Sequence, residues 1–253
     1  MTVRKLTGSV EVLRATGRDP FALVRFSGDC VAYQTKDALV VARPIAGGDV
    51  VMPWHGTHQS VELLARLTDD AVIQPVVVEV TRAGLPSVAD RLPLGEVTEW
   101  SLLWTDTPDG SPDGPADDHA DERIVSLGDR DHPEIDEIFD EALPYTTNRP
   151  GAGRRQRGWY GIRIDGRLAA VAVDREEAGL GYIAGVAVRP EHQGQGLGTA
   201  LVRTLTGRLV AEFGRCALGV VDGNPRALEL FQRLGYTGRQ DLAYARVVPA
   251  GSR

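Results

Sequence analysis

One stretch, residues 181–213, constrains the structure of this chain more than any other. It begins with a short apolar run at 182–188, rich in β-branched residues, which predicts a buried strand. Three alternate glycines follow within 194–198, and 199–213 then carries apolar residues four apart, which predicts an amphipathic helix. A strand, a glycine loop and a helix in this order form an anion site, because the first amides of a helix lack intrahelical partners and the helix dipole is positive there.

The residues of the loop distinguish three classes of phosphate-binding protein. A P-loop requires Lys and then Ser or Thr directly after its last glycine, but Thr199 and Ala200 follow the last glycine here. A dinucleotide-binding fold requires a third glycine at the position of Thr199. What remains is the string QGQGLG at residues 193–198, with VRP upstream of it at 188–190.

This string resembles the pyrophosphate loop of the GCN5-related N-acetyltransferases (GNAT), Q/R-x-x-G-x-G/A, which holds acetyl-CoA. Two further strings agree with the resemblance: NPRA at 224–227 is similar to the family's N-x-x-A, and LGY at 234–236 is similar to its L-G-F/Y ending. The resemblance covers residues 123–248, about half of the chain. It implies an α/β (α+β) fold in which a mixed, mostly antiparallel sheet is flanked by helices.

The resemblance also implies which residues hold the cofactor. In this family the strand before the loop is splayed from its neighbour, and its free backbone groups pair with the pantetheine arm like an added strand. The loop amides hold the pyrophosphate, and the Asn of N-x-x-A contacts the cofactor. The implied acetyl-CoA-binding residues are Val186, Ala187, Val188, Gln193, Gly194, Gln195, Gly196, Leu197, Gly198, Thr199 and Asn224.

The reaction that the resemblance implies is direct attack of an acceptor amine on acetyl-CoA. A base must then take a proton from the amine, and a Tyr of the family often protonates the departing thiolate. Phe231 stands at the position of that Tyr and cannot donate a proton. Tyr182 matches one family position for the base, and the acids Asp174, Glu176 and Glu177 end the preceding strand. We expect Tyr182 and Glu176 to be the catalytic candidates, with a solvated turn as the alternative interpretation of the acids.

Residues 107–122 divide the chain. They contain three prolines, two glycines and a run of acidic residues, with almost no apolar side chain. Such a composition is typical of a linker or an exposed loop. We therefore expect a domain at 1–106, an acidic Pro/Gly linker at 107–122 and the GNAT domain at 123–253.

A weak internal repeat relates the two halves. Residues 88–94 align with 230–236, and the same offset lays 99–104 on 241–246, so both halves end as strand, helix and strand. The first half has no glycine loop, and residues 52–60 stand in its place. We expect two tandem acetyltransferase-like domains, the first a degenerate GNAT-like domain without a CoA loop. Chance similarity is the alternative.

The pattern of the first half also predicts individual elements. Short apolar or alternating runs at 21–26, 30–35 and 38–43, separated by turn residues, predict antiparallel strands. Residues 60–67 carry apolar side chains on one helical face and predict a helix, and the β-branched run at 72–80 predicts a buried strand.

Composition excludes several functions. The formal net charge of −7 over 253 residues argues against nucleic acid or an anionic membrane as the main partner. Two distant cysteines, Cys30 and Cys216, form neither a disulfide framework nor a metal pair, and His55 with His58 gives too few ligands for a metal site. We expect a cytoplasmic protein without metal, since no signal-peptide or membrane-spanning run is visible. A homodimer is one assembly that the sequence allows.

The leading hypothesis is an acetyl-CoA-dependent N-acetyltransferase with one active site, which acts on a small-molecule or peptide amine. The first alternative is a non-catalytic acyl-CoA-binding or regulatory module, in which Phe231 reports lost chemistry. A second alternative is transfer of a larger acyl group, or transfer to another acceptor atom, on the same scaffold. The acceptor itself cannot be read from the residues.

Overall fold

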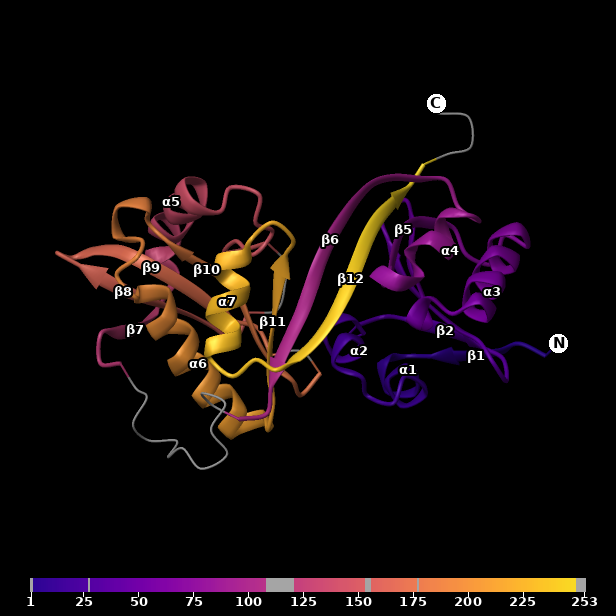
Figure 1. Cartoon of the computed structure of the whole chain (residues 1–253), viewed down its shortest axis with the longest axis horizontal. Coiled ribbons are helices and arrows are strands. Elements are labelled where there is room, and N and C mark those ends of the chain that lie inside the picture. Colours follow the sequence, from indigo (N-terminus) through magenta and orange to yellow (C-terminus); the bar gives the residue numbers. More distant parts are fainter. Residues whose placement is uncertain (1, 27, 108–120, 153–155, 177, 249–253) are drawn as a thin grey trace. The chain divides into compact units, whose positions relative to one another are not determined.

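The computed structural model describes residues 2–26, 28–107, 121–152, 156–176 and 178–248 (Figure 1). The chain forms two compact units. Unit 1 comprises Met1–Leu102, Val220–Asn224 and Arg239–Arg253, and unit 2 comprises Leu103–Gly219 and Pro225–Gly238. Most of the expected linker at 107–122 lies outside the described residues.

Unit 1 is a sheet flanked by helices, with the strand order β1-β2-β3-β4-β5-β12-β6. β4 and β5 run parallel, whereas β1 to β4 pair antiparallel in succession. Its elements are β1 (Arg4–Thr7), α1 (Ser9–Ala15), α2 (Pro20–Arg25), β2 (Val31–Gln34), β3 (Leu39–Ile45), β4 (Gly48–Pro53), η1 (Trp54–Gly56), α3 (His58–Asp69), β5 (Pro75–Thr81), η2 (Arg82–Gly84), α4 (Leu85–Ala89), most of β6 (Leu94–Thr105) and most of β12 (Gly238–Val247).

One predicted strand of unit 1 is wrong. The apolar run at 21–26 forms the helix α2 instead, because Asp19 accepts a hydrogen bond from the amide of Phe21 and Pro20 occupies the first turn. An Asp cap followed by Pro is a helix-start signal, and it outweighs the apolar composition of a short run. The expected helix at 60–67 and strand at 72–80 are confirmed as α3 and β5.

Unit 2 repeats this plan, with the strand order β6-β11-β10-β9-β8-β7. α6 packs against β10, where Leu209 approaches Gly181, and α5 contacts the same strand through Phe139 near Gly185. Its elements are β7 (Ile124–Leu127), η4 (Asp129–Asp131), α5 (His132–Ala142), β8 (Gly158–Ile164), β9 (Arg167–Asp174), β10 (Gly181–Val188), η5 (Pro190–His192), α6 (Leu197–Phe213), β11 (Cys216–Val221) and α7 (Pro225–Arg233). The predicted fold class, with a mixed and mostly antiparallel sheet in each half, is confirmed.

The last strand of the second half belongs to the sheet of unit 1. β12 ends the second half in sequence, yet it pairs with β5 of unit 1 from Leu242↔Thr81 to Arg246↔Val77. Ala243 and Ala245 of β12 lie in the apolar core that also contains α3 side chains. The structure thus differs from the expected boundary, which placed all of 123–253 in one domain, because alternation predicts a strand but not the sheet that it joins.

Candidate functional site

β10 and β11 pair over only three residues. The parallel register runs through Gly181↔Cys216, Tyr182↔Ala217 and Ile183↔Leu218, and β10 then continues for five more residues. Among the described strands, none therefore pairs with residues 184–188 on the edge of β10 that faces away from β9. We call this edge the open edge of β10. Such an edge offers backbone donors and acceptors to an extended ligand.

A β-bulge lies where this edge begins. β10 pairs with β9 through Ala184↔Val173 and again through Ala187↔Val171, so that two residues of β10 are inserted opposite one residue of β9. Gly185 in the bulge has φ 56°, and a Cβ there would come within 3.0 Å of the Phe139 ring. The bulge was not among the predicted features, although an isolated glycine inside a strand pattern is a signal for one.

Alternation decides which backbone groups reach the open edge. The amide of Arg189 donates to the carbonyl of Ala169 at 2.9 Å, which makes 189 and 187 the residues that bond to β9. Val188 between them therefore directs its amide and carbonyl outward. The side chain of Gln193 donates to the Val188 carbonyl at 3.3 Å, which confirms that this carbonyl is accessible from the loop.

The glycine loop lies open at the start of α6. Gly194 and Gly196 have φ 81° and 80°, and no atom lies within 4 Å of the position that a Gly196 Cβ would take. Gly196 is the N-cap, so no side chain satisfies the amides of the first turn. Gly198 packs close to Val188, which sets the start of α6 against β10. The result is an exposed cradle of amides with no Cβ inside it.

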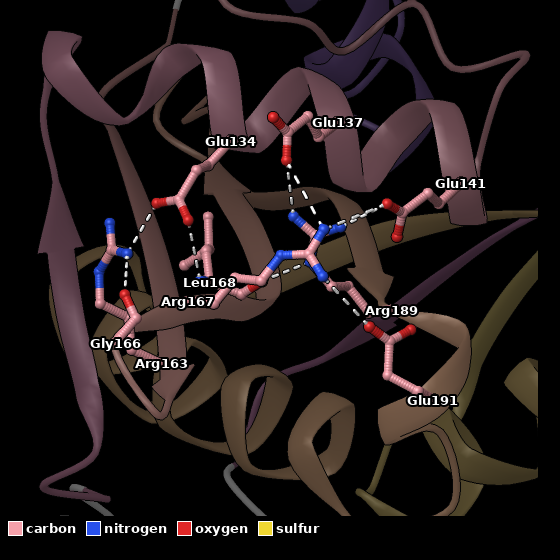
Figure 2. A network of polar contacts seen from close by, with 9 residues as sticks. All are labelled: Glu134, Glu137, Glu141, Arg163, Gly166, Arg167, Leu168, Arg189 and Glu191. Carbon is pink, nitrogen blue, oxygen red and sulfur yellow. Dashed lines mark hydrogen bonds and ion pairs between the residues drawn. The ribbon is translucent and has the colours of Figure 1, made fainter.

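A buried arginine holds the residue at which β10 passes into the loop (Figure 2). The Arg189 side chain has no exposed surface, and its Nε donates to the Leu168 carbonyl at 2.7 Å. Its two terminal nitrogens pair with Glu141 at 2.5 Å and Glu137 at 3.1 Å, both on α5. Arg167 adds a longer contact of 3.7 Å to Glu191 within the loop. These contacts fix the direction in which the chain enters the cradle.

Comparison with known proteins agrees with this geometry. Residues 118–236 match the profile of the Acetyltransferase (GNAT) family. This segment is a GNAT domain. It is similar to an uncharacterized N-acetyltransferase of Methanocaldococcus jannaschii, with 33% identity over 84 residues, which are 32% of this chain and 54% of that protein.

Solved structures match the fold of the chain well beyond the GNAT domain. A GCN5-related N-acetyltransferase from Sphaerobacter thermophilus has a TM-score of 0.55 at 18% identity, covering 98% of this chain and 96% of its own. A tandem GNAT protein from the clavulanic acid biosynthesis pathway, solved without AcCoA, has a TM-score of 0.53 at 12% identity and covers 98% and 100%. The predicted tandem arrangement is confirmed at the level of the fold.

In the GNAT domain, Tyr182 is buried on β10 just before the bulge. The guanidinium of Arg175 lies 5.4 Å from its ring, and the Arg175 amide donates to the Tyr182 carbonyl. Arg175 also donates to Asn148 at 3.1 Å, and Asn148 approaches the bulge at Gly185. Tyr182 therefore belongs to a packed group beside the point where β10 leaves β11.

The acidic candidates at the end of β9 take different positions. Glu176 accepts a bond from the Gly179 amide at 2.7 Å and so stabilises its own turn. Asp174 is only 5% exposed, and burial raises its pKa; Arg157, at 3.8 Å, opposes this shift, and Glu212 adds to it. Both partners of Asp174 lie near the C-terminal end of α6, at the opposite end from the cradle. Glu177 lies outside the described residues.

The start and the end of α7 carry the other predicted positions. Asn224 directly precedes the helix and is exposed, whereas Phe231 is buried with its ring 5.9 Å from that of Tyr236. The Tyr236 hydroxyl lies 2.7 Å from Thr206 and 3.3 Å from Cys216, and burial raises the pKa of the Cys216 thiol to about 12. The Tyr236 hydroxyl is therefore already hydrogen-bonded inside the core.

The described ranges also bear on metal binding and on membrane insertion. Across these ranges, no three His, Cys, Asp or Glu side chains gather closely enough to hold a metal ion. Within the same part of the chain, no helix has both the length and the apolar character needed to cross a bilayer.

Proposed function

We propose that the GNAT domain binds acetyl-CoA along the open edge of β10 and transfers the acetyl group to the amine of an acceptor. The observation that carries this proposal is the open cradle of amides, with glycines at φ 81° and 80°, at the end of a strand edge that has no partner among the described strands. GNAT enzymes use acetyl-CoA, and the residues present fit its two most distinctive groups, a pyrophosphate and an extended arm.

The pyrophosphate would lie on the amides of the loop from Gly194 to Thr199, where the helix dipole favours negative charge. Val186 and Val188 would pair with the pantetheine amides, because Val188 directs its backbone groups to the open edge and Val186 has no register partner on β9. The backbone of Ala187 faces β9, so its contribution is its small buried side chain. The remaining residues assigned to the cofactor are Gln193, Gln195, Leu197, Gly198 and Asn224.

In the proposed reaction the amine nitrogen attacks the thioester carbonyl, a C–N bond forms and the C–S bond breaks. The amide of Val186, which lies within the bulge, would stabilise the negative charge on the carbonyl oxygen. The nitrogen loses a proton to a base, for which Tyr182 is our first candidate and Glu176 our second. The thiolate takes its proton from water, since Phe231 has none to give.

The acceptor that we propose is a small-molecule or peptide amine, used in the cytoplasm. Its site would lie beside Tyr182, where the loop that contains Asn148 covers the bulge. The acidic composition of the chain is compatible with a cationic acceptor.

The test is calorimetry of CoA with the full chain, which we expect to give one site per chain. Gly196→Glu should abolish binding, because its side chain occupies the cradle and its charge repels phosphate. Gly214→Glu is the matched control, since Gly214 caps the other end of α6 at φ 75° with equally open surroundings. Both substitutions carry a similar backbone strain of about 1–2 kcal/mol. Unchanged affinity in Gly196→Glu, or two sites per chain, would contradict the proposal.

The absence of a hydroxyl at Phe231 favours a second candidate function, a binding module without chemistry. Acetyl transfer to a panel of amines, with CoA affinity measured in the same preparation, separates the two. Turnover at an ordinary enzymatic rate excludes the binding module, and tight CoA binding without transfer to any amine supports it.

A further inference from the structure

The NPRA string contains an arginine between its Pro and its Ala. Arg226 is the second residue of α7 and is exposed. Its terminal nitrogen Nη2 lies 3.9 Å from the position that a Cβ on Gly194 would take. A guanidinium therefore lies directly beside the glycine loop, although it comes from a helix that follows the loop by about thirty residues.

Arg226 differs from the neighbouring arginines in its partners. Within the described part of the chain, no carboxylate lies within 4 Å of its guanidinium. By contrast, other guanidinium groups of unit 2 pair with acids: Arg157 with Glu212, Arg163 with Glu134 and Asp131, and Arg189 with Glu141 and Glu137.

The position of Arg226 is also unfavourable for the helix that carries it. A cation in the first turn opposes the helix dipole, which favours negative charge there. Glu229, one turn later, makes no ion pair with it in the described structure. No described residue of unit 2 thus accounts for a positive charge at this point, whereas an anion on the loop beside it would.

We infer that Arg226 is a phosphate-binding residue of the cofactor site, and that its guanidinium contacts the pyrophosphate of CoA from α7 while the loop amides contact it from α6. This rests on the proposed function. The pyrophosphate is favoured over the 3′-phosphate because Gly194 is itself part of the cradle. Arginine suits this role, since its planar donors can bind two phosphate oxygens together and no existing ion pair must break.

The control for this inference is Arg233 on the same helix. It follows Arg226 by seven residues, which is close to two turns, so it lies on nearly the same face about 10 Å farther from the cradle. It is exposed, and the described residues give it no carboxylate within 4 Å either. Arg226→Ala and Arg233→Ala therefore remove the same charge at two distances from the loop.

The experiment measures the Kd of the full chain for CoA and for 3′-dephospho-CoA. Arg226→Ala should weaken both ligands by about the same factor, roughly tenfold or more, as expected for a charge-assisted hydrogen bond. Arg226→Lys should recover part of the loss, and Arg233→Ala should stay within about twofold of wild type. Thermal unfolding should show that Arg226→Ala is as stable as wild type, since alanine suits a helix and removes the unfavourable charge.

Three results would overturn the inference. Loss of affinity for CoA alone would assign Arg226 to the 3′-phosphate. Equal losses in the two alanine variants would mean that only the general field matters, and no loss in Arg226→Ala would remove the contact. In all three, wild type still binds CoA, so the proposed function stands. A wild-type chain that binds no CoA would instead overturn the proposed function, and this inference with it.

Discussion

The segment after β4 in unit 1 and the segment after β10 in unit 2 stand at corresponding places of one repeated plan, but they differ in what occupies the start of the following helix. In unit 1 the side chain of Thr57 caps α3 by accepting a hydrogen bond from the Ser60 amide, and Ser60 in turn accepts from the Leu39 amide. In unit 2 the corresponding cap is Gly196, which has no side chain to offer. Unit 1 thus satisfies its helix start with a side chain, whereas the N-cap residue of α6 in unit 2 makes no side-chain hydrogen bond.

In addition to the Thr57 cap, close packing fills the turn after β4 in unit 1. Gly56 lies so close to Gly84 that a Cβ on Gly56 would come within 2.5 Å of the Gly84 Cα, and the Thr81 hydroxyl donates to the His55 carbonyl at 3.1 Å. The end of β5 is thereby tied to the turn after β4. No described neighbour lies within 4 Å of the equivalent position at Gly196.

The residue that directly follows the strand differs as well. Trp54 follows β4 and packs with Phe21, at 6.2 Å between ring centroids, and with Phe26, at 5.9 Å. Arg189 follows β10 and is buried in ion pairs with α5. The two units therefore share the parallel strand pair and the helix after it, and they differ in a few residues of the turn, on which the proposed cofactor site depends.

The largest expected effect is on the stability of the chain when the turn after β4 and the glycine loop after β10 are each substituted. Gly56→Ala should destabilise the chain by about 3 kcal/mol, because it adds backbone strain at φ 62° to a clash with the Gly84 backbone. Gly196→Ala should cost only the strain, about 1 kcal/mol, but should weaken CoA binding. Urea unfolding and calorimetry on both variants check this. Equal destabilisation by the two substitutions would show that the turns are packed alike.

The next prediction concerns the buried arginine of unit 2. Arg189→Met should destabilise the chain by about 2 kcal/mol, because the lost pairs involve a fully buried guanidinium but carboxylates that remain partly exposed. Arg167→Met is the control in the same network, with longer contacts and a side chain that is 56% exposed, and should cost less than about 1 kcal/mol. Equal costs in urea unfolding would mean that burial of Arg189 does not matter.

The turn after β4 and the glycine loop after β10 also show how far the sequence could predict the structure. The glycine loop and its helix were predictable, because alternate glycines between an apolar run and an amphipathic segment rarely form anything but a close turn into a helix. For unit 1 the sequence indicated only that a glycine loop is absent. The contact between Gly56 and Gly84 could not be predicted, because it joins segments far apart in the chain. The helix α2 was predicted as a strand, because a six-residue run that is mostly apolar does not distinguish helix from strand; the cap at Asp19 is the signal that does.

The candidate site was predictable in part for the same reason. Motif positions such as Gly194 and Asn224 follow from local strings, and the bulge at Gly185 had a local signal that was overlooked. The placement of β12 in unit 1 had no such signal, because an alternating pattern predicts a strand but not the sheet that it joins. Arg226 stood inside a recognised motif, but only its distance to Gly194 gave it a role.

A smaller effect is expected at Phe231 of α7. In the internal repeat, Phe231 aligns with Ala89 of α4, so unit 1 has no aromatic ring at this position. If the chain is a transferase limited by thiolate departure, Phe231→Tyr should hold or raise turnover, by up to about 10²-fold. Phe231→Leu is the control that changes packing without a hydroxyl and should not raise it. A fall in kcat for Phe231→Tyr, with CoA affinity unchanged, would place the acid elsewhere.

The smallest effect concerns Asp174, the carboxyl group that unit 2 buries at the end of β9. In unit 1 the strand β3 ends with the uncharged Ile45. Burial raises the pKa of Asp174 despite Arg157, so the folded chain holds this proton more tightly than the unfolded chain does. The stability from protonated Asp174 is complete below the unfolded pKa and is lost as pH rises through the folded pKa. Asp174→Asn removes this loss, so the variant should gain stability relative to wild type from about pH 4 to 7, by less than about 1 kcal/mol. Asp165→Asn, in the exposed turn at the other end of β9, should show no such trend in urea unfolding at the two pH values. If the stability of Asp174→Asn relative to wild type instead falls as pH rises, the sign of the effect is reversed. Arg157, rather than burial, would then dominate the pKa of Asp174.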